Sequence, residues 1–333
     1  MTHDQITVAN ALAISGLRFR HFRGESDYSR MVAVILSSAE ADKIERTDTA
    51  EDIARNYGHL TNCDPYQDMI FAEIGGEVIG YSRGWWWDEP ATGRLYGMVG
   101  FLVPAWRRKG IGRVMLLWME NHLRDIAATH PTDRAGSFQV SVSQFEEGTT
   151  IMLERADYQP IRYFHEMVRP TLDDIPDWPL LDGLEVRPAL PDHYRAIWAS
   201  VDEGSQDEWG YTGEDYETWL NNIPHFQPHL WQIAWDTATE QVAGHVLTFI
   251  DPAENEKFNR KRGYTEGIGV GRAWRRRGLA RALIARSLQA QKAAGMSESA
   301  LVADSDSISG VTRLYESCGF RVVRRDTIYR KPF

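Results

Sequence analysis

The sequence predicts an α/β protein with two tandem domains, each a mixed, mostly antiparallel central sheet flanked by helices on both faces. Three observations predict it. The chain has 333 residues, enough for about two domains. Each half runs through a hairpin and then a strand–helix–strand segment, which adds parallel to antiparallel pairing. The segment Trp106–Arg113, WRRKGIGR, returns 168 positions later as Trp274–Arg281, WRRRGLAR.

The first half alternates between the two periodicities that mark strands and helices. Gly75-Gly76 separates two apolar runs and is typical of a hairpin turn. Asp27 and Thr49 precede helical spacing and are the expected N-caps. The expected strands are Leu17–Arg23, Met69–Ile74, Glu77–Trp87, Arg94–Val103, Ser137–Val142 and Arg162–Arg169, and the expected helices are Asp27–Ala39, Thr49–Tyr57, Gly110–Ala128 and a short one ending near Glu154–Asp157.

The second half repeats this order. Asp192 is the expected cap of its first helix, and Gly295 is the expected stop after its long helix. The expected strands are Leu184–Pro188, Trp231–Trp235, Val242–Ile250, Tyr264–Gly271, Ser299–Ala303 and Arg321–Lys331, and the expected helices are Asp192–Glu203, Gly278–Ala294 and Val311–Ser317. Three prolines and four aspartates in Pro170–Gly183 resemble a linker, so the predicted domains are 1–170 and 184–333, joined by 171–183.

Composition excludes several classes of protein. The 37 basic and 47 acidic residues leave a net charge of −10, which argues against nucleic-acid binding. Two cysteines, Cys63 and Cys318, give no disulfide framework, and no histidine spacing suits a metal. We find no signal peptide and no apolar run long enough for a membrane span, so we expect a cytoplasmic protein, either a monomer or a homodimer.

The repeated basic turn is built to hold phosphate. Each copy follows an apolar strand and opens a long amphipathic helix. Backbone N–H groups at such a junction point into one concavity, and the helix dipole adds partial positive charge. Gly110 and Gly278 give the backbone freedom, and Gly112 and Ala280 leave space for the ligand. Neither turn ends in Gly-Lys-Ser/Thr, so a nucleotide-binding P-loop is a poor alternative.

Here the chain resembles the GCN5-related N-acetyltransferases. A strand, Arg-x-x-Gly-x-Gly/Ala and a helix are similar to that family's motif A, in which the turn holds the pyrophosphate of acetyl-CoA. The segment Leu314–Phe320, LYESCGF, is similar to the family's Leu-Tyr-Glu-x-x-Gly-Phe signature. The tandem layout is similar to two-domain members such as mycothiol synthase.

The resemblance implies acetyl transfer from acetyl-CoA to a primary amine, with Tyr315 as the acid on the leaving thiol. Glu266 is the expected base, directly or through water, with Asp304 and Asp306 as weaker alternatives. It also implies cofactor-binding positions in both halves. They are Gly269, Val270, Gly271, Arg275, Arg276, Arg277, Gly278, Leu279, Ala280 and Arg281 in the second half, and Phe101, Leu102, Val103, Arg107, Arg108, Lys109, Gly110, Ile111, Gly112 and Arg113 in the first.

The halves differ where the family carries its acid. Leu153 stands opposite Tyr315 and cannot donate a proton, and Asp157 replaces Gly319. Ser307 stands near the position where the family usually has asparagine. We therefore expect the N-terminal half to keep a CoA-binding turn without the acid, and the C-terminal half to catalyse.

The acceptor is expected to be a small-molecule amine. The acidic segment after the first helix of the second half falls where the family often builds its acceptor pocket, and Glu203, Asp207 and Trp209 are the candidate substrate residues. Two alternatives stay open: a protein or peptide amine as acceptor, and a non-catalytic acyl-CoA sensor. The sequence does not name the amine.

Overall fold

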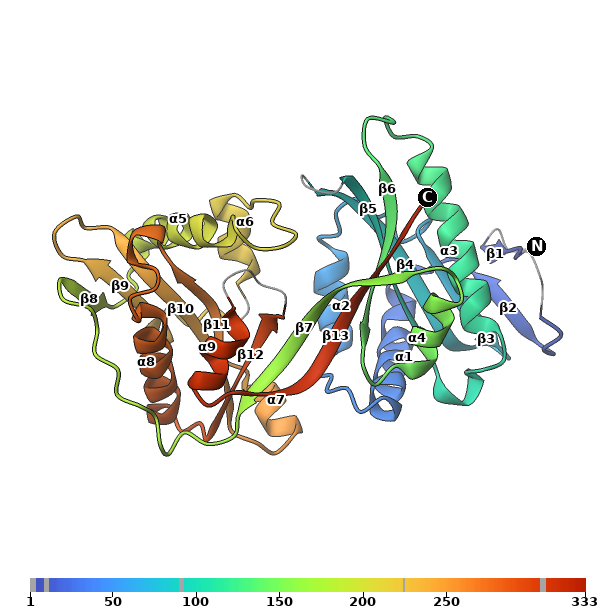
Figure 1. Cartoon of the computed structure of the whole chain (residues 1–333). Helices are drawn as coiled ribbons and strands as arrows, with labels where there is room; N and C mark the ends of the chain where they lie inside the picture. The colour runs from blue at the N-terminus through green and yellow to red at the C-terminus, as the bar shows by residue number, and fades with distance from the viewer. Residues whose placement is uncertain (1–3, 9–11, 90–92, 224, 306–309) are drawn as a thin grey trace. The chain divides into compact units, whose positions relative to one another are not determined.

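The computed structural model describes residues 4–8, 12–89, 93–223, 225–305 and 310–333. The chain forms two compact units: unit 1 comprises Met1–Ile161 and Asp326–Phe333, and unit 2 comprises Arg162–Arg325. Each unit has a mostly antiparallel sheet with helices on both faces (Figure 1), so the predicted fold class is confirmed. One parallel pair joins β5 to β6 in unit 1, and another joins β11 to β12 in unit 2.

Unit 1 has the strand order β1-β2-β3-β4-β5-β6-β13. Its elements are β1 (Gln5–Ile6), β2 (Leu17–Arg20), α1 (Tyr28–Ala41), α2 (Ala50–Tyr57), β3 (Met69–Ile74), β4 (Glu77–Glu89), β5 (Gly93–Leu102), α3 (Ile111–Ala127), β6 (Gly136–Ser143), α4 (Glu147–Glu154) and the end of β13 (Arg321–Pro332). Helices α1 and α2 bury Met31 and Ile53 against one face of the sheet. Helix α3 buries Val114 and Met119 against the other face, and this separates two hydrophobic cores.

Unit 2 has the strand order β7-β12-β11-β10-β9-β8. Its elements are β7 (Gln159–Arg169), β8 (Leu184–Arg187), α5 (Tyr194–Ser205), α6 (Tyr216–Asn222), β9 (Gln232–Asp236), β10 (Val242–Ile250), α7 (Pro252–Lys257), β11 (Arg262–Val270), α8 (Leu279–Ala293), β12 (Glu298–Asp304) and α9 (Val311–Ser317). Helix α8 buries Leu283 and Leu288 in one core, while α5 and α6 bury Ile197 and Trp219 in the other.

Two strands pair in a unit other than the one predicted from their place in the sequence. Strand β7 pairs antiparallel with β12, from Phe164 opposite Asp304 to Arg169 opposite Ser299. The end of β13 pairs with β6, from Asp326 opposite Ser143. The units therefore divide at 161/162 and 325/326, whereas the predicted join was 171–183. Alternation identifies a strand but not its partner, which accounts for the difference.

Three of the four residues predicted at helix ends stand at the predicted positions, namely Asp27, Thr49 and Gly295. Thr49 accepts the Asp52 N–H in a capping box. Gly295 has φ +87° after α8, and the N–H of Met296 closes back on the carbonyl of Gln291. Asp192 lies in a 3₁₀ turn, and His193 is the N-cap of α5, so that prediction was wrong.

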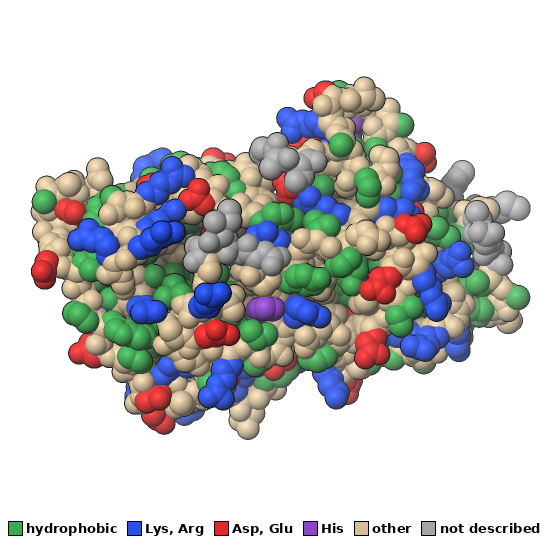
Figure 2. All heavy atoms as spheres, viewed as in Figure 1, with side chains coloured by type: hydrophobic (Ala, Val, Ile, Leu, Met, Phe, Trp, Pro, Cys, Tyr) green, Lys and Arg blue, Asp and Glu red, His purple; other side chains and the backbone are tan. Residues whose placement is uncertain are grey.

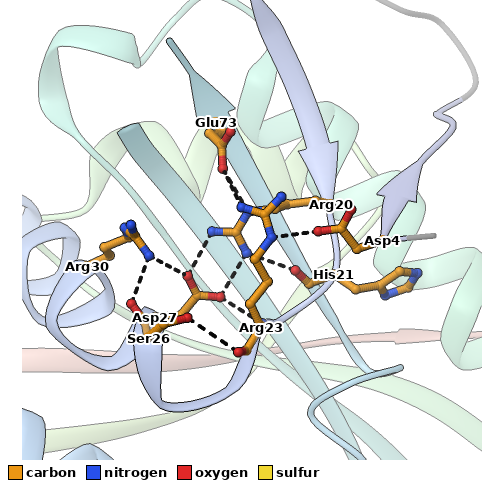
Figure 3. Close-up of polar contacts among 8 residues, drawn as sticks. All are labelled: Asp4, Arg20, His21, Arg23, Ser26, Asp27, Arg30 and Glu73. Atoms are coloured by element: carbon orange, nitrogen blue, oxygen red, sulfur yellow. Dashed lines mark hydrogen bonds and ion pairs between the residues drawn. The ribbon is translucent and has the colours of Figure 1, made fainter. Parts of the chain in front are cut away.

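Asp27 stands at the N-cap of α1 but makes no side-chain cap bond, because an ion pair takes its carboxylate (Figure 3). Arg20 Nη1 and Nη2 each donate to Asp27 at 2.8 Å, and the Arg23 N–H donates at 2.9 Å. Arg20 Nε also donates to Glu73 at 2.8 Å. Arg20 is 3% exposed and Asp27 is 0% exposed, so this charge pair is sealed inside unit 1.

We expect Asp27→Ala to destabilise unit 1 by about 3–5 kcal/mol, because it leaves the Arg20 guanidinium buried without its main counter-charge. Urea unfolding monitored by tryptophan fluorescence measures the change. The control is Arg55→Ala, which removes an exposed ion pair with Asp52 and is expected to change stability by less than about 1 kcal/mol. Equal effects of the two variants would contradict this role of the buried pair.

Acidic, basic and hydrophobic side chains are interspersed over the face that Figure 2 shows. Among the helices of the described residues, none combines the length and the apolar run that crossing a membrane requires.

Candidate active site

The two basic turns have the same backbone conformation. Gly110 and Gly278 are the N-caps of α3 and α8, with φ of +87° and +92° in the left-handed region. Two residues earlier, Arg108 and Arg276 also have positive φ, at +60° and +59°. This conformation is unfavourable for residues with a Cβ, so its occurrence in both units indicates one shared turn design.

Each turn presents free backbone N–H groups at a helix start. The Val114 N–H donates to the carbonyl of Gly110, and the Ala282 N–H donates to that of Gly278. The N–H groups of the three residues between each of these donors and its acceptor therefore have no carbonyl partner within the helix. With the helix dipole behind them, they form a site suited to a phosphate group.

The first arginine of each turn is held by the protein. Arg107 donates through Nε to the Leu102 carbonyl and through Nη2 to Asp42 at 2.7 Å. Arg275 donates through Nε to the Val270 carbonyl and through Nη1 to Asp207 at 2.7 Å. Both side chains thus brace the turn against the preceding strand. Their guanidinium groups therefore donate to acceptors of the protein itself, whereas the sequence analysis predicted that they contact the cofactor.

The remaining basic side chains of the turns are exposed. Arg276, Arg277 and Arg281 in unit 2 have no ion-pair partner among the described residues, and neither do Arg108 and Arg113 in unit 1. In unit 1 the Lys109 ammonium lies 4.4 Å from the centre of the Trp106 ring. The exposed arginines can supply forked donors to a diphosphate.

The parallel strands of unit 2 part just before the turn. Strand β11 pairs with β12 only from Arg262 to Tyr264 within the described residues. Beyond that point the Glu266 carboxylate accepts the Val302 N–H at 3.0 Å. A carboxylate therefore satisfies a backbone donor that the parting of the strands leaves without a ladder partner.

A β-bulge aims Glu266 at this gap. The pairing of β10 with β11 shifts between His245, opposite Gly269, and Leu247, opposite Glu266. Gly267 lies in the bulge with φ +53°, and a Cβ there would meet Leu247 at 2.9 Å. The extra residue changes which side chains face α5, a common use of bulges near functional sites.

A cavity of about 210 Å³ lies between α5 and β11. It brings together the two predicted catalytic residues, Glu266 and Tyr315, and the predicted cofactor residue Gly269. The residues that line it are Val201, Gly204, Ser205, Glu208, His245, Glu266, Gly267, Ile268, Gly269, Val302 and Tyr315. The Tyr315 hydroxyl, in a side chain that is largely buried, makes no hydrogen bond to the described residues. The cavity wall thus carries both the Glu266 carboxyl and the Tyr315 hydroxyl.

The cavity perturbs both groups. Burial raises the pKa of Glu266 to about 7, with the Val302 N–H opposing the shift. Burial, with the nearby Glu266 and Glu208 carboxylates, raises the pKa of Tyr315 above its usual value. At neutral pH, therefore, Glu266 can accept a proton and Tyr315 stays protonated as a donor.

The three predicted substrate residues are placed differently from one another. Glu203 is exposed and does not line the cavity. Asp207 pairs with Arg272 and Arg275 of the turn, which lowers its pKa. Trp209 packs near Phe164, with ring centres 6.1 Å apart.

Of the two alternative bases, only Asp304 lies among the described residues. Asp304 forms an ion pair with Arg162. Asp306 and Ser307 lie outside the described residues.

Two further residues line the cavity: Glu208, which belongs to the predicted acidic segment but was not one of its three named candidates, and His245, which sequence reasoning missed. Glu208 is exposed as a whole residue, but its carboxyl lies at the cavity wall, where partial desolvation and the Asp304 carboxylate raise its pKa. A signal existed for each residue. Glu208 continues the one-face spacing of Val201, Gly204 and Ser205 just past the end of α5, and His245 is the one polar residue in the run VAGHVL of β10.

Unit 1 repeats the geometry around Tyr315 without its hydroxyl. The Phe320 N–H donates to the Tyr315 carbonyl at 3.1 Å, and the Tyr158 N–H donates to the Leu153 carbonyl at 3.1 Å. The residue before each of these two donors has positive φ: +87° at Gly319 and +66° at Asp157. These matching bonds place Leu153, which is 1% exposed, where unit 2 has its tyrosine.

Unit 1 also has no carboxylate at the place of Glu266. Counted back from the turn, Met98 and Val99 occupy the positions of Glu266 and Gly267. The pairing of β4 with β5 runs without a register shift, so this strand has no bulge. No group of three or more potential metal-ligating side chains occurs among the described residues of either unit.

The repeated turn, the parted strands and the two-unit fold define an acyl-CoA-dependent transferase, and comparison with known proteins agrees. A sequence model of the Acetyltransferase (GNAT) family matches residues 34–132 and 194–320. These segments lie in both units and together cover more than half of the chain. The chain therefore belongs to the GNAT acetyltransferase family, whose enzymes use acyl-CoA.

Among individual proteins, the chain is similar to a mycothiol acetyltransferase of Renibacterium salmoninarum. The two are 24% identical over 261 residues, which cover 73% of this chain and 69% of the relative. A GCN5-related N-acetyltransferase from Sphaerobacter thermophilus has a similar structure, with a TM-score of 0.76, 24% identity and 97% coverage of both chains. A tandem GNAT protein from the clavulanic acid biosynthesis pathway gives a TM-score of 0.64 at 18% identity, covering 95% of this chain and 98% of its own.

Proposed function

We propose that unit 2 transfers an acetyl group from acetyl-CoA to a primary amine of a small molecule. The observation that carries the proposal is the cavity that Glu266 and Tyr315 both line. It lies beside the parted strands β11 and β12, and the basic turn after β11 leads into helix α8. A proton acceptor with a pKa near 7 and a proton donor with a much higher pKa suit acyl transfer from a thioester.

The turn of unit 2 fits the diphosphate of coenzyme A. The N–H groups of Leu279, Ala280 and Arg281 open α8, and the exposed side chains of Arg276 and Arg277 flank them. Gly278 has no atom within 4 Å of the place where a Cβ would stand, so the turn is open to a ligand. Acetyl-CoA, when bound here, supplies an acetyl group activated as a thioester.

The residues of the cavity divide the proton transfers between them. Glu266 takes a proton from the acceptor ammonium group, so that the nitrogen can attack as a neutral amine. Tyr315 donates its hydroxyl proton toward the sulfur that leaves, whose thiol has an ordinary pKa of about 8.5. Glu208, unpaired among the described side chains, gives the cavity mouth a negative charge that favours a cationic acceptor. The names of the mycothiol and clavulanic acid relatives also favour a small-molecule acceptor over a protein.

We further propose that unit 1 holds a coenzyme A molecule without catalysing transfer. Its turn matches that of unit 2 in backbone angles, which supports binding. Leu153 and Met98 carry no proton donor or acceptor at the places of Tyr315 and Glu266, which argues against a second reaction centre.

A thiol-release assay with a panel of small amines tests transfer, and calorimetry with coenzyme A tests the turns. We expect turnover with at least one amine and two binding events per chain. Gly278→Ala and Gly110→Ala each place a Cβ at positive φ, and each is expected to weaken a different event by roughly tenfold. Tight binding without thiol release for any amine would instead make the protein a sensor of acyl-CoA, and release only with peptides would make the acceptor a protein.

A further inference from the structure

We propose that His245 of unit 2 binds a hydroxyl group of the acceptor, so that the preferred substrates are primary amines that also carry a hydroxyl. This role rests on the proposed function, because it takes the amine to react beside Glu266 and Tyr315. It gives a function to a buried imidazole that the transfer of the acetyl group does not itself use. Ser200, which holds the imidazole, is then a positioning residue.

The His245 side chain is a buried polar group with one bonded and one free nitrogen. The residue is 2% exposed, and its Nδ1 lies 3.1 Å from the Oγ of Ser200 on α5, which is 8% exposed. The other ring nitrogen, Nε2, has no hydrogen-bond partner among the described residues. A buried polar atom without a partner costs free energy, so its place in the wall of a cavity points to a ligand.

Two glycines leave the free edge of the imidazole uncovered. The Cε1–Nε2 edge lies over Gly269 of β11, where a Cβ would collide with both atoms. On the side of α5, a Cβ on Gly204 would lie 3.9 Å from Cε1. His245 and both glycines line the cavity that also contains Glu266. Neither glycine places a side chain between this edge and the cavity.

Unit 1 fills the matching position with apolar packing. His245 lies opposite Gly269 in the pairing of β10 with β11, and Tyr81 lies opposite Phe101 in the pairing of β4 with β5. Phe101 stands 168 positions before Gly269, the spacing of the repeated turns. Tyr81 is 3% exposed, and its ring centre lies 5.4 Å from that of Phe101 in a hydrophobic core. Unit 2 has an imidazole and a glycine instead, which bury less apolar surface and leave room for a ligand.

A hydroxyl is the ligand group that suits this nitrogen. Burial lowers the pKa of His245 to about 4, so the ring is neutral at physiological pH. If Ser200 donates to Nδ1, Nε2 carries the proton and donates; if Nδ1 donates to Ser200, Nε2 accepts. A hydroxyl serves either tautomer, whereas a carbonyl can only accept. An ammonium group binds better to the carboxylates of Glu266 and Glu208 in the same cavity.

The amine and the hydroxyl bind a short distance apart. Glu266 and Gly269 are three residues apart on β11, so their Cα atoms are separated by at most about 10 Å. The imidazole of His245 lies beside Gly269, and the amine reacts beside Glu266. An acceptor with a few atoms between its nitrogen and its oxygen therefore reaches both groups.

The experiment compares a series of amino alcohols, from ethanolamine to aminohexanol, each with the alkylamine in which a methyl group replaces the hydroxyl. The thiol-release assay with acetyl-CoA gives kcat/KM for every pair. For at least one chain length we expect the amino alcohol to be preferred by about tenfold to a hundredfold, because the alkylamine leaves Nε2 without a partner.

Three variants test whether His245 is the cause of the preference. His245→Phe combined with Ser200→Ala removes both partners of the buried hydrogen bond and is expected to reduce the ratio to about one. His245→Gln keeps a polar atom near the place of Nε2 and is expected to retain part of the preference. Ser200→Ala alone frees the ring and is expected to reduce the ratio by roughly threefold, so it decides the question if the double variant does not fold.

The matched control is Tyr81→Phe, which removes the polar atom of the corresponding side chain in unit 1 and is expected to leave the ratio unchanged. The dissociation constant of coenzyme A, measured by calorimetry, should be the same in all variants. The role of His245 is overturned if no amino alcohol is preferred, if the double variant keeps the preference, or if that variant weakens coenzyme A binding instead. Absence of thiol release with every amine would overturn the proposed function, and calorimetry of the same pairs on protein loaded with coenzyme A would still test the contact.

Discussion

Tyr315→Phe is expected to lower kcat by about 10²- to 10⁴-fold, the usual contribution of a positioned general acid, with the dissociation constant of acetyl-CoA unchanged. The hydroxyl makes no hydrogen bond to the described residues, so its removal leaves no protein group without a partner. The ring remains packed at 6.4 Å from Phe320. The lost rate would therefore measure proton donation alone. Stopped-flow detection of released thiol gives kcat, and calorimetry gives the binding constant.

The control for this variant is Tyr158→Phe in unit 1. Tyr158 corresponds to Phe320 in the matching turn, and its hydroxyl lies 3.9 Å from Met98 Sδ, with the Glu120 carboxylate also nearby. We expect it to leave kcat unchanged. If Tyr315→Phe also retained full kcat with acetyl-CoA bound, Tyr315 would not be the acid.

Glu266→Gln is expected to reduce kcat/KM by about 10²- to 10⁴-fold and to abolish its dependence on pH near 7. The pKa of Glu266 is raised to about 7, so the wild-type rate should rise as the pH increases through 7 and the carboxylate ionises. Glutamine can still accept the Val302 N–H, so the local structure is kept. Glu203→Gln, on the same acidic segment but outside the cavity, should keep the wild-type profile. If the rate of Glu266→Gln still rose as the pH increased through 7, Glu266 would not be the base.

The same variant, Glu266→Gln, is expected to gain stability at high pH while it loses activity. A carboxyl with a folded-state pKa of about 7, above its unfolded value of about 4.5, stabilises the folded state at low pH, and that contribution disappears as the pH rises through 7. We therefore expect Glu266→Gln to raise the melting temperature of unit 2 at pH 8, with a gain that shrinks toward pH 5. Loss of activity together with gain of stability is a signature of a functional residue held at the expense of folding.

Much of the candidate site follows from local sequence. The positive-φ glycines, the Leu-Tyr-Glu segment and the substitution of Leu153 for Tyr315 are short-range patterns, and the structure places them as the patterns predict. What could not be predicted depends on contacts between distant residues. Ser200 and His245 are 45 positions apart, and only the fold makes them neighbours.

The same limit explains the errors in the fold. The Asp27 carboxylate was expected to cap a helix, but Arg20 lies on a neighbouring strand and binds it more completely. Local composition suggested a boundary at the proline-rich segment 171–183. Strand β7 belongs to unit 2 and the end of β13 to unit 1, so the units divide at 161/162 and 325/326 instead. Helix and strand propensities predict the individual elements well, whereas tertiary packing determines which elements pair with each other.

The pairing of β13 with β6 determines the order in which the chain can finish folding. Residues 326–333 close the sheet of unit 1, yet the ribosome makes them only after all of 162–325. During synthesis β6 therefore stays an open sheet edge, while unit 2 can assemble its own strands first. Any fragment that stops before residue 326 leaves that edge bare and prone to associate with other chains. Expression of unit 1 alone thus calls for a circular permutant that carries the closing strand.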